Sequence, residues 1–150
     1  MATSLSQERK YTIAKAFFDT NILIYAADSE FSEKREAARQ VLNSHRRAGS
    51  GAISTQVMLE FQVNAIRKLG LSSEHAHHLL TALRAGLEVV SATPDLVDEA
   101  IALSQRYQLG PFDAMILASA QASRCSVLLT EDFSSGARLG SVRVENPLPK

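Results

Sequence analysis

Short apolar runs alternate with amphipathic helical patterns along this sequence, and this alternation constrains the fold more than any other feature. The runs typical of strands lie at 14–19, 52–53, 87–90, 126–129 and 142–144. Strands that alternate with helices favour a parallel or mostly parallel sheet with helices on its faces, because a parallel connection must cross over the sheet. The sequence therefore predicts an α/β fold in which the last run is an edge strand.

The segments between these runs carry the helical patterns. Apolar residues recur at three- and four-residue steps, and capping residues or glycines bound the segments. The expected helices cover 33–45, 55–69, 72–86, 93–104 and 112–123. The last of these is rich in alanine, which indicates a closely packed helix.

Composition and charge exclude several classes of protein. The chain has 150 residues, of which 45% are hydrophobic, and a chain of this size can form a core without a structural metal or disulfide. Sixteen Lys plus Arg balance sixteen Asp plus Glu, so nucleic-acid binding must come from local patches rather than from overall charge. Cys125 is the single cysteine, and no run is long enough to span a membrane. We therefore expect a cytoplasmic protein without membrane contact.

Four acidic residues lie where surface charge is a poor explanation for them. Asp19 and Asp132 follow predicted strands, Glu60 lies beside the apolar stripe of its helix, and Asp113 opens the alanine-rich helix. Each alone has an ordinary structural interpretation, such as a helix cap or a favourable charge at a helix N-terminus. Together they are more informative, because a mostly parallel sheet brings the ends of these elements to one crevice.

The chemistry of these four residues favours a cation. Carboxylates crowded into one crevice repel one another, so they either take up protons or hold a cation between them. No histidine or cysteine accompanies the set, and oxygen-only ligands favour Mg²⁺ or Mn²⁺ over zinc. An ion of this kind is typical of phosphoryl chemistry, where it neutralises phosphate oxygens.

The segments around the four acids resemble, in order, the four signature segments of the PIN-domain nucleases. They are FDTNIL at 18–23, STQVMLEF at 54–61, FDAMI at 112–116 and LTEDF at 129–133. The length and the ending at 142–147 are most similar to the VapC-type toxins of bacterial toxin–antitoxin pairs. The resemblance implies a three-layer sandwich with a mostly parallel central sheet of about five strands. It also implies a single nuclease domain over 14–150. The polar residues at 1–13 are expected to form an N-terminal tail, which is longer than these toxins usually carry.

The resemblance assigns roles to individual residues. The family's catalytic, metal-binding acidic positions correspond to Asp19, Glu60, Asp113 and Asp132. Asn21 and Thr130 match polar positions that hydrogen-bond to those carboxylates and orient them. The implied reaction is hydrolysis of an RNA phosphodiester bond by metal-activated water. Glu131, next to Asp132, leaves open which of the two carboxylates faces the metal.

Partners are implied in the same way. They are an RNA substrate, a cognate antitoxin whose C-terminal segment lies across the acidic crevice, and a second copy of the chain. The homodimer would be built on the early helices, here 33–48 and 55–69.

Other functions and other candidate sites remain open. A PIN-fold protein could keep the crevice only for binding, as a catalytically silent scaffold. A phosphatase or receiver domain is a third possibility, although such phosphatases usually have a second aspartate where this chain has Asn21. His75 and His78 share a helical face that is better explained as solvated than as a metal site.

Basic side chains form three groups along the chain. They are Arg46 with Arg47, Arg67 with Lys68, and Arg84. Each group could contact phosphate, but charged helix ends are the commoner explanation.

Overall fold

The computed structural model describes residues 13–150, so residues 1–12 of the expected polar tail lie outside the described part. The strands are β1 (Ala16–Phe18), β2 (Gly51–Ser54), β3 (Glu88–Val90), β4 (Val127–Leu129), β5 (Arg138–Leu139) and β6 (Val142–Glu145). The helices are α2 (Thr20–Ala27), α3 (Glu33–Ala48), α4 (Thr55–Leu69), α5 (Ser73–Arg84), α6 (Pro94–Tyr107) and α7 (Pro111–Ala122).

The strands form one six-stranded sheet in the order β3-β2-β1-β4-β6-β5. All neighbours pair in parallel except β5 and β6, which are antiparallel. The expected α/β fold with a mostly parallel sheet is therefore confirmed. The strand order reverses at β1, which lies between β2 and β4. In sheets of this kind the functional crevice opens beyond the carboxyl ends of the strands at such a reversal.

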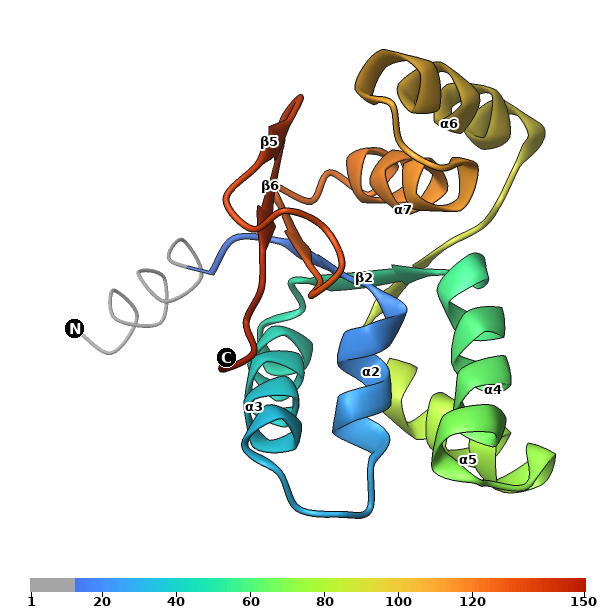
Figure 1. Ribbon diagram of the computed structural model, residues 1–150, viewed down its shortest axis with the longest axis vertical. Helices are drawn as coiled ribbons and strands as arrows, with labels where there is room; N and C mark the ends of the chain where they lie inside the picture. Colours follow the sequence, from blue (N-terminus) through green and yellow to red (C-terminus); the bar gives the residue numbers. More distant parts are fainter. Residues whose placement is uncertain (1–12) are drawn as a thin grey trace.

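The helices cover both faces of the sheet. Figure 1 shows α6 and α7 on one side and the helices α2 to α5 on the other. Every residue of α7 from Ala114 to Ala120 is buried, because the sheet covers one side of this helix and α6 packs along another. Small alanine side chains allow this close approach, so the expected tight packing of the alanine-rich helix is confirmed.

The C-terminal strands differ from the expectation. The run at 142–144 was expected to be an edge strand, and this is wrong, because β6 lies between β4 and β5. The edge is β5, which has two residues and is mostly exposed, so it leaves no apolar pattern in the sequence. Gly140, with φ of +64°, lies in the tight turn between the two strands, a conformation that glycine adopts without strain.

Helix α2 was not expected from the sequence pattern. It has eight residues, and Ile22, Leu23 and Ile24 are all buried. A helix covered on so many sides lacks the polar face that makes helical periodicity visible. Its start directly after β1 turns the residues of the first signature segment toward the crevice.

None of the helices within residues 13–150 is long and apolar enough to cross a membrane.

Candidate active site

Asp19 lies at the centre of the candidate site, directly after β1. Its backbone amide donates to the Leu129 carbonyl of β4 at 3.0 Å. Its Oδ1 accepts the backbone amide of Thr20 at 2.8 Å and so caps α2. Its Oδ2 accepts the hydroxyl of Thr130 at 2.8 Å. Asp19 therefore serves as a helix cap and also lines the pocket between the strand ends.

The environment of Asp19 favours its neutral form. Burial raises the pKa of Asp19 to about 6, against the hydrogen bonds from Thr130 and Thr20, which lower it. The negative charges of Asp132 and Glu60 add to the rise. A positive charge in the pocket would reverse this preference, because it stabilises the carboxylate.

The residues after β4 form one hydrogen-bonded network with the first turn of α2. The amide Nδ2 of Asn21 donates to Asp132 Oδ2 at 3.0 Å and to Thr130 Oγ1 at 3.2 Å. The same Thr130 oxygen accepts the backbone amide of Asp132 at 3.1 Å. Asn21 and Thr130, the two polar residues expected to orient carboxylates, thus contact Asp132 and Asp19 directly.

Glu60 reaches the pocket from the second turn of α4. Its Oε2 accepts the hydroxyl of Thr20 at 2.8 Å, and its Oε1 accepts Gln56 Nε2 at 2.7 Å. Gln56 Nε2 also donates to the Phe112 carbonyl at 3.2 Å. This amide therefore connects the start of α4 to the start of α7, where Asp113 follows.

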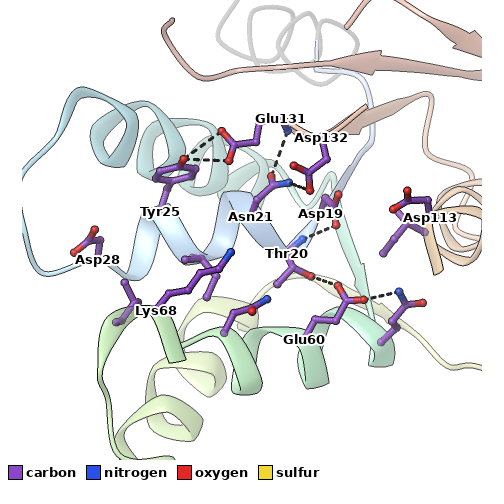
Figure 2. Close-up of a pocket in the computed structure, with 15 residues that line it drawn as sticks. Asp19, Thr20, Asn21, Tyr25, Asp28, Glu60, Lys68, Asp113, Glu131 and Asp132 are labelled. Carbon is purple, nitrogen blue, oxygen red and sulfur yellow. Dashed lines mark hydrogen bonds between the residues drawn. The ribbon is translucent and has the colours of Figure 1, made fainter. Parts of the chain in front are cut away.

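Asp113 approaches the pocket from the first turn of α7. The residue is exposed overall, but partial desolvation of its carboxyl raises the pKa, and the charges of Asp132 and Glu60 raise it further. The structure thus brings all four predicted acidic residues to one pocket from four different elements or their ends. Figure 2 shows Asp132, Asp113 and Glu60 arranged around Asp19.

The pocket has a volume of about 350 Å³ and extends from these acids along α2 and α4. Its described lining includes no histidine or cysteine, so its charged donors to a cation are carboxylate oxygens. Within residues 13–150, no three acidic, histidine or cysteine side chains converge closely enough to surround one ion by themselves. The four carboxylates thus line one pocket without forming a ready-made set of three ligands around one point.

The Glu131 carboxylate binds Tyr25 and Lys34 at the edge of the pocket. Its carboxylate accepts the hydroxyl of Tyr25 at 3.0 and 3.2 Å, and the ammonium of Lys34 lies 3.6 Å from Oε2. The ammonium also lies 5.3 Å from the centroid of the Tyr25 ring. The Asp132 carboxylate accepts from the Asn21 amide, whereas Glu131 contacts Asn21 only through its backbone amide, which donates to Asn21 Oδ1 at 3.4 Å.

Several residues of the site were not identified from the sequence. They are Thr20, Gln56 and Asn64, which all line the pocket, whereas Lys68 was already among the basic residues that could contact phosphate. Two signals were available: Thr20 lies inside the first signature segment, and Gln56 and Asn64 lie one helical turn either side of Glu60. His75 and His78, by contrast, are exposed on α5, as their interpretation as a solvated face predicts.

Comparisons with known proteins add to this geometry. The PIN domain family model matches residues 16–134. A toxin–antitoxin complex from Klebsiella pneumoniae contains a chain that is 29% identical, with a TM-score of 0.65 over 88% of this chain and 97% of that one. No curated protein matches.

Two further solved structures share the fold at lower identity. A chain of VapBC2 from Rickettsia felis, bound to a DNA fragment from its promoter, is 20% identical with a TM-score of 0.67, over 87% of this chain and 97% of that one. VapC20 of Mycobacterium tuberculosis, a toxin that cleaves the sarcin–ricin loop, is 21% identical with a TM-score of 0.66. That match covers 85% of this chain and 98% of VapC20.

Proposed function

This chain belongs to the PIN domain family, and we propose that it is a ribonuclease that hydrolyses RNA phosphodiester bonds with the help of Mg²⁺ or Mn²⁺. One observation carries the proposal: four carboxylates from separate elements converge on a single pocket at the reversal point of the sheet. Burial of Asp19 without a cationic partner costs free energy, and its raised pKa records that cost. A divalent cation bound in the pocket would offset this free-energy cost.

Asp19, Glu60, Asp113 and Asp132 are the residues that would hold the ion. When bound, it neutralises phosphate oxygens and lowers the pKa of water that attacks the phosphorus. The chain's own contribution is orientation, because a carboxylate fixed in advance needs no reorganisation when substrate binds. Thr130 and Asn21 fix the carboxylates of Asp19 and Asp132.

Glu60 is fixed in the same manner from the other wall of the pocket. Thr20 and Gln56 each donate to one of its two carboxylate oxygens. Asp113 is exposed, which leaves its carboxylate open to an incoming ion and to substrate. We therefore expect RNA cleavage to be more sensitive to loss of the negative charge at Asp113 than to its loss at the other three acidic residues.

We further propose that the protein is the toxin of a toxin–antitoxin pair and acts in the cytoplasm. The likeness to a chain of the Klebsiella complex over nearly the whole length of both chains supports this. A cognate antitoxin would cover the acidic pocket, where its basic side chains would meet uncompensated carboxylates. The RNA-cleaving activity of VapC20 supports RNA as the class of substrate.

A homodimer completes the proposal, and an apolar face on α4, α6 and α7 supports it. Its large side chains are 38% to 73% exposed and comprise Leu59, Val63, Ile66, Val97, Ile101 and Phe112. A specific interface needs roughly 800 Å² from each copy with an apolar centre, and this face supplies such a centre. Of the two helices expected at the dimer surface, we retain α4, since none of the exposed large hydrophobics among residues 13–150 belongs to α3.

Cleavage of a mixed-sequence fluorogenic RNA tests the enzymatic proposal. We expect cleavage with Mg²⁺ or Mn²⁺, none in EDTA, and a loss of roughly 100-fold or more in Asp113→Asn because the variant removes one charge that faces the ion. Asp95→Asn is the matched control, because Asp95 also lies in the first turn of a helix that begins with proline. It should cleave RNA at the parent rate.

Two results would contradict the proposal. Cleavage that persists at the parent rate in a folded Asp113→Asn protein would remove the acidic pocket from the mechanism. RNA binding without cleavage under any metal would instead identify a catalytically silent binding protein of the same fold.

A further inference from the structure

The pocket continues beyond the four acids as a groove between α2 and α4. One wall carries Asn21, Tyr25 and Asp28 from α2 and its C-terminal end. The other carries Glu60, Asn64 and Lys68, which lie four residues apart on α4 and therefore on one side of that helix. The acids lie near the N-terminal ends of both helices, so Lys68 and Asp28 mark the far end of the groove.

The charges of this groove are strongly unbalanced. Six carboxylates line it, from Asp19, Asp28, Glu60, Asp113, Glu131 and Asp132. Among the described lining residues Lys68 is the only one with a positive charge. A divalent ion at the four acids compensates charge only at that end, so a polyanion that follows the groove needs another cation farther along it.

Lys68 is available for that purpose. Its side chain is exposed and forms no ion pair with any residue in the described range 13–150. Asp28, the acid at the same end, is tied to its loop, because its Oδ1 accepts the Glu30 amide at 3.0 Å. Figure 2 shows the Lys68 side chain pointing into the pocket from below, toward the side on which Thr20 lies.

We propose that Lys68 binds a phosphate of the RNA strand other than the one that is cleaved, and so sets the path of the strand along the groove between α2 and α4. The inference rests on the proposed ribonuclease function and names a binding residue for it. The described pocket-lining residues of the α2 wall include no cation, and the nearby Lys34 is paired with Glu131.

The spacing along α4 suits a neighbouring phosphate. Eight residues separate Glu60 from Lys68, which corresponds to about 12 Å along the helix axis. Helical side chains lean toward the N-terminus of their helix, so the ammonium lies closer to the acids than its Cα atom does. A stacked single strand advances about 3.4 Å per nucleotide, which places the bound phosphate about two to three nucleotides from the cleaved bond.

A role of Lys68 in stabilising its helix has to be distinguished from a role in binding phosphate. Arg67 and Lys68 both lie in the last turn of α4, where any cation interacts favourably with the helix dipole. Arg67 is exposed but does not line the pocket. Arg67→Gln is therefore a matched control, since it removes the same charge from the same turn of the helix.

The test is RNA binding in the Asp113→Asn background, in the presence of Mg²⁺. Fluorescence anisotropy of a labelled 12-nucleotide single-stranded RNA, measured over a series of salt concentrations, gives the slope of log affinity against log salt. We expect Lys68→Gln to weaken binding about fivefold and to make the slope shallower by about 0.7, the value for one phosphate contact in single-stranded nucleic acid. Lys68→Arg should restore the slope, and Arg67→Gln should leave it unchanged.

Kinetics in the otherwise native protein provide a second measurement. Lys68→Gln should raise KM about fivefold and leave kcat within about twofold, because the contact is made equally in the ground state and the transition state. Equal salt slopes for Lys68→Gln and Arg67→Gln would overturn the assignment and leave the ribonuclease proposal intact. No binding of the RNA by the Asp113→Asn protein, together with no cleavage by the parent protein, would overturn both.

Discussion

Asp19 is subject to two opposing requirements. As the cap of α2 and the acceptor of the Thr130 hydroxyl it is needed as an acceptor of hydrogen bonds, and as a buried carboxylate it is unstable when charged. The fold retains it in spite of this cost, which is expected of a group whose charge is used. The stability of the metal-free protein should report the cost directly.

The pKa of Asp19 gives the sign of that effect. The folded protein holds the proton up to about pH 6, whereas an unfolded chain releases it near 3.8. Between these values the folded state binds more protons, so this group's contribution to stability falls as pH rises and is lost above about pH 6. Asp19→Asn cannot ionise, so in EDTA its free energy of unfolding, measured by urea titration, should lack the fall, on the order of 2 kcal/mol, that the parent shows between acid pH and about pH 7.5. Its amide keeps one of the two acceptor oxygens, so any lost hydrogen bond adds an offset that does not depend on pH.

The pH-dependent part of the difference from the parent should vanish below about pH 3, where Asp19 is protonated in both the folded and the unfolded state. Asp98→Asn, which changes an exposed aspartate of α6, should unfold as the parent does at every pH. A pH-independent gap between Asp19→Asn and the parent would contradict the assignment of the raised pKa to Asp19.

Of the four acidic residues that the sequence predicted, Asp19, Asp113 and Asp132 lie at element ends, and Glu60 lies inside a helix beside its apolar stripe. Asp19 and Asp132 follow strands, and the position of a strand's end is visible in a local apolar run. The partners of these acids were harder to predict, because the contact between Thr20 and Glu60 joins residues 40 apart and depends on how α2 meets α4. The same limit applies to Lys68, which has no local feature that separates it from Arg67.

At the scale of elements, a helix or strand could be predicted from the sequence when one of its faces is polar and the other apolar. Helices α3 to α6 have polar outer faces and were expected close to their observed bounds. Helix α2 is short and mostly buried, and β5 is short and mostly exposed, so neither shows the periodicity that would reveal it. The position of β6 inside the sheet could not be predicted without β5.

The starts of the helices provide a test at this scale. Within residues 13–150, α7 is the only helix that begins without a side-chain cap, since Gly110 precedes it. Gly110 has φ of −59°, which any residue adopts, and an added Cβ would meet no atom within 4 Å. Gly110→Ser should therefore cap α7 and raise the free energy of unfolding by about 0.5 kcal/mol in a urea titration.

Helix α6 offers the reverse change. Thr93 caps it, and Pro94 follows as Pro111 follows Gly110. Thr93→Ala should lower the free energy of unfolding by about 1 kcal/mol. A destabilised Gly110→Ser protein would show that the start of α7, and with it Asp113, depends on a bare backbone at this position.

At the scale of the whole molecule, the proposed homodimer depends on the apolar face of α4, α6 and α7. A charge at Leu59, which is 71% exposed, should not disturb the core but should oppose burial against a second copy. We expect Leu59→Glu to be monomeric in light scattering at concentrations where the parent is a dimer.

Phe31 is the control for this substitution. It is 73% exposed and lies outside the apolar face, between α2 and α3. Phe31→Glu should keep the mass of the parent. A parent protein that is monomeric at high micromolar concentration would remove the second copy from the proposal.

The distance in sequence between the two halves of the acidic pocket has a consequence for how activity arises during synthesis. Thr130 and Asp19 are 111 residues apart, and β1 meets β4 only after β2 and β3, with their helices, have been made. Contacts over such a separation form late in folding, because the entropy cost of closing a long loop comes before the contacts can stabilise it. A nascent chain on the ribosome therefore has no assembled pocket until β4 has emerged, so under the proposed function the messenger being translated is not exposed to nuclease activity from its own unfinished product.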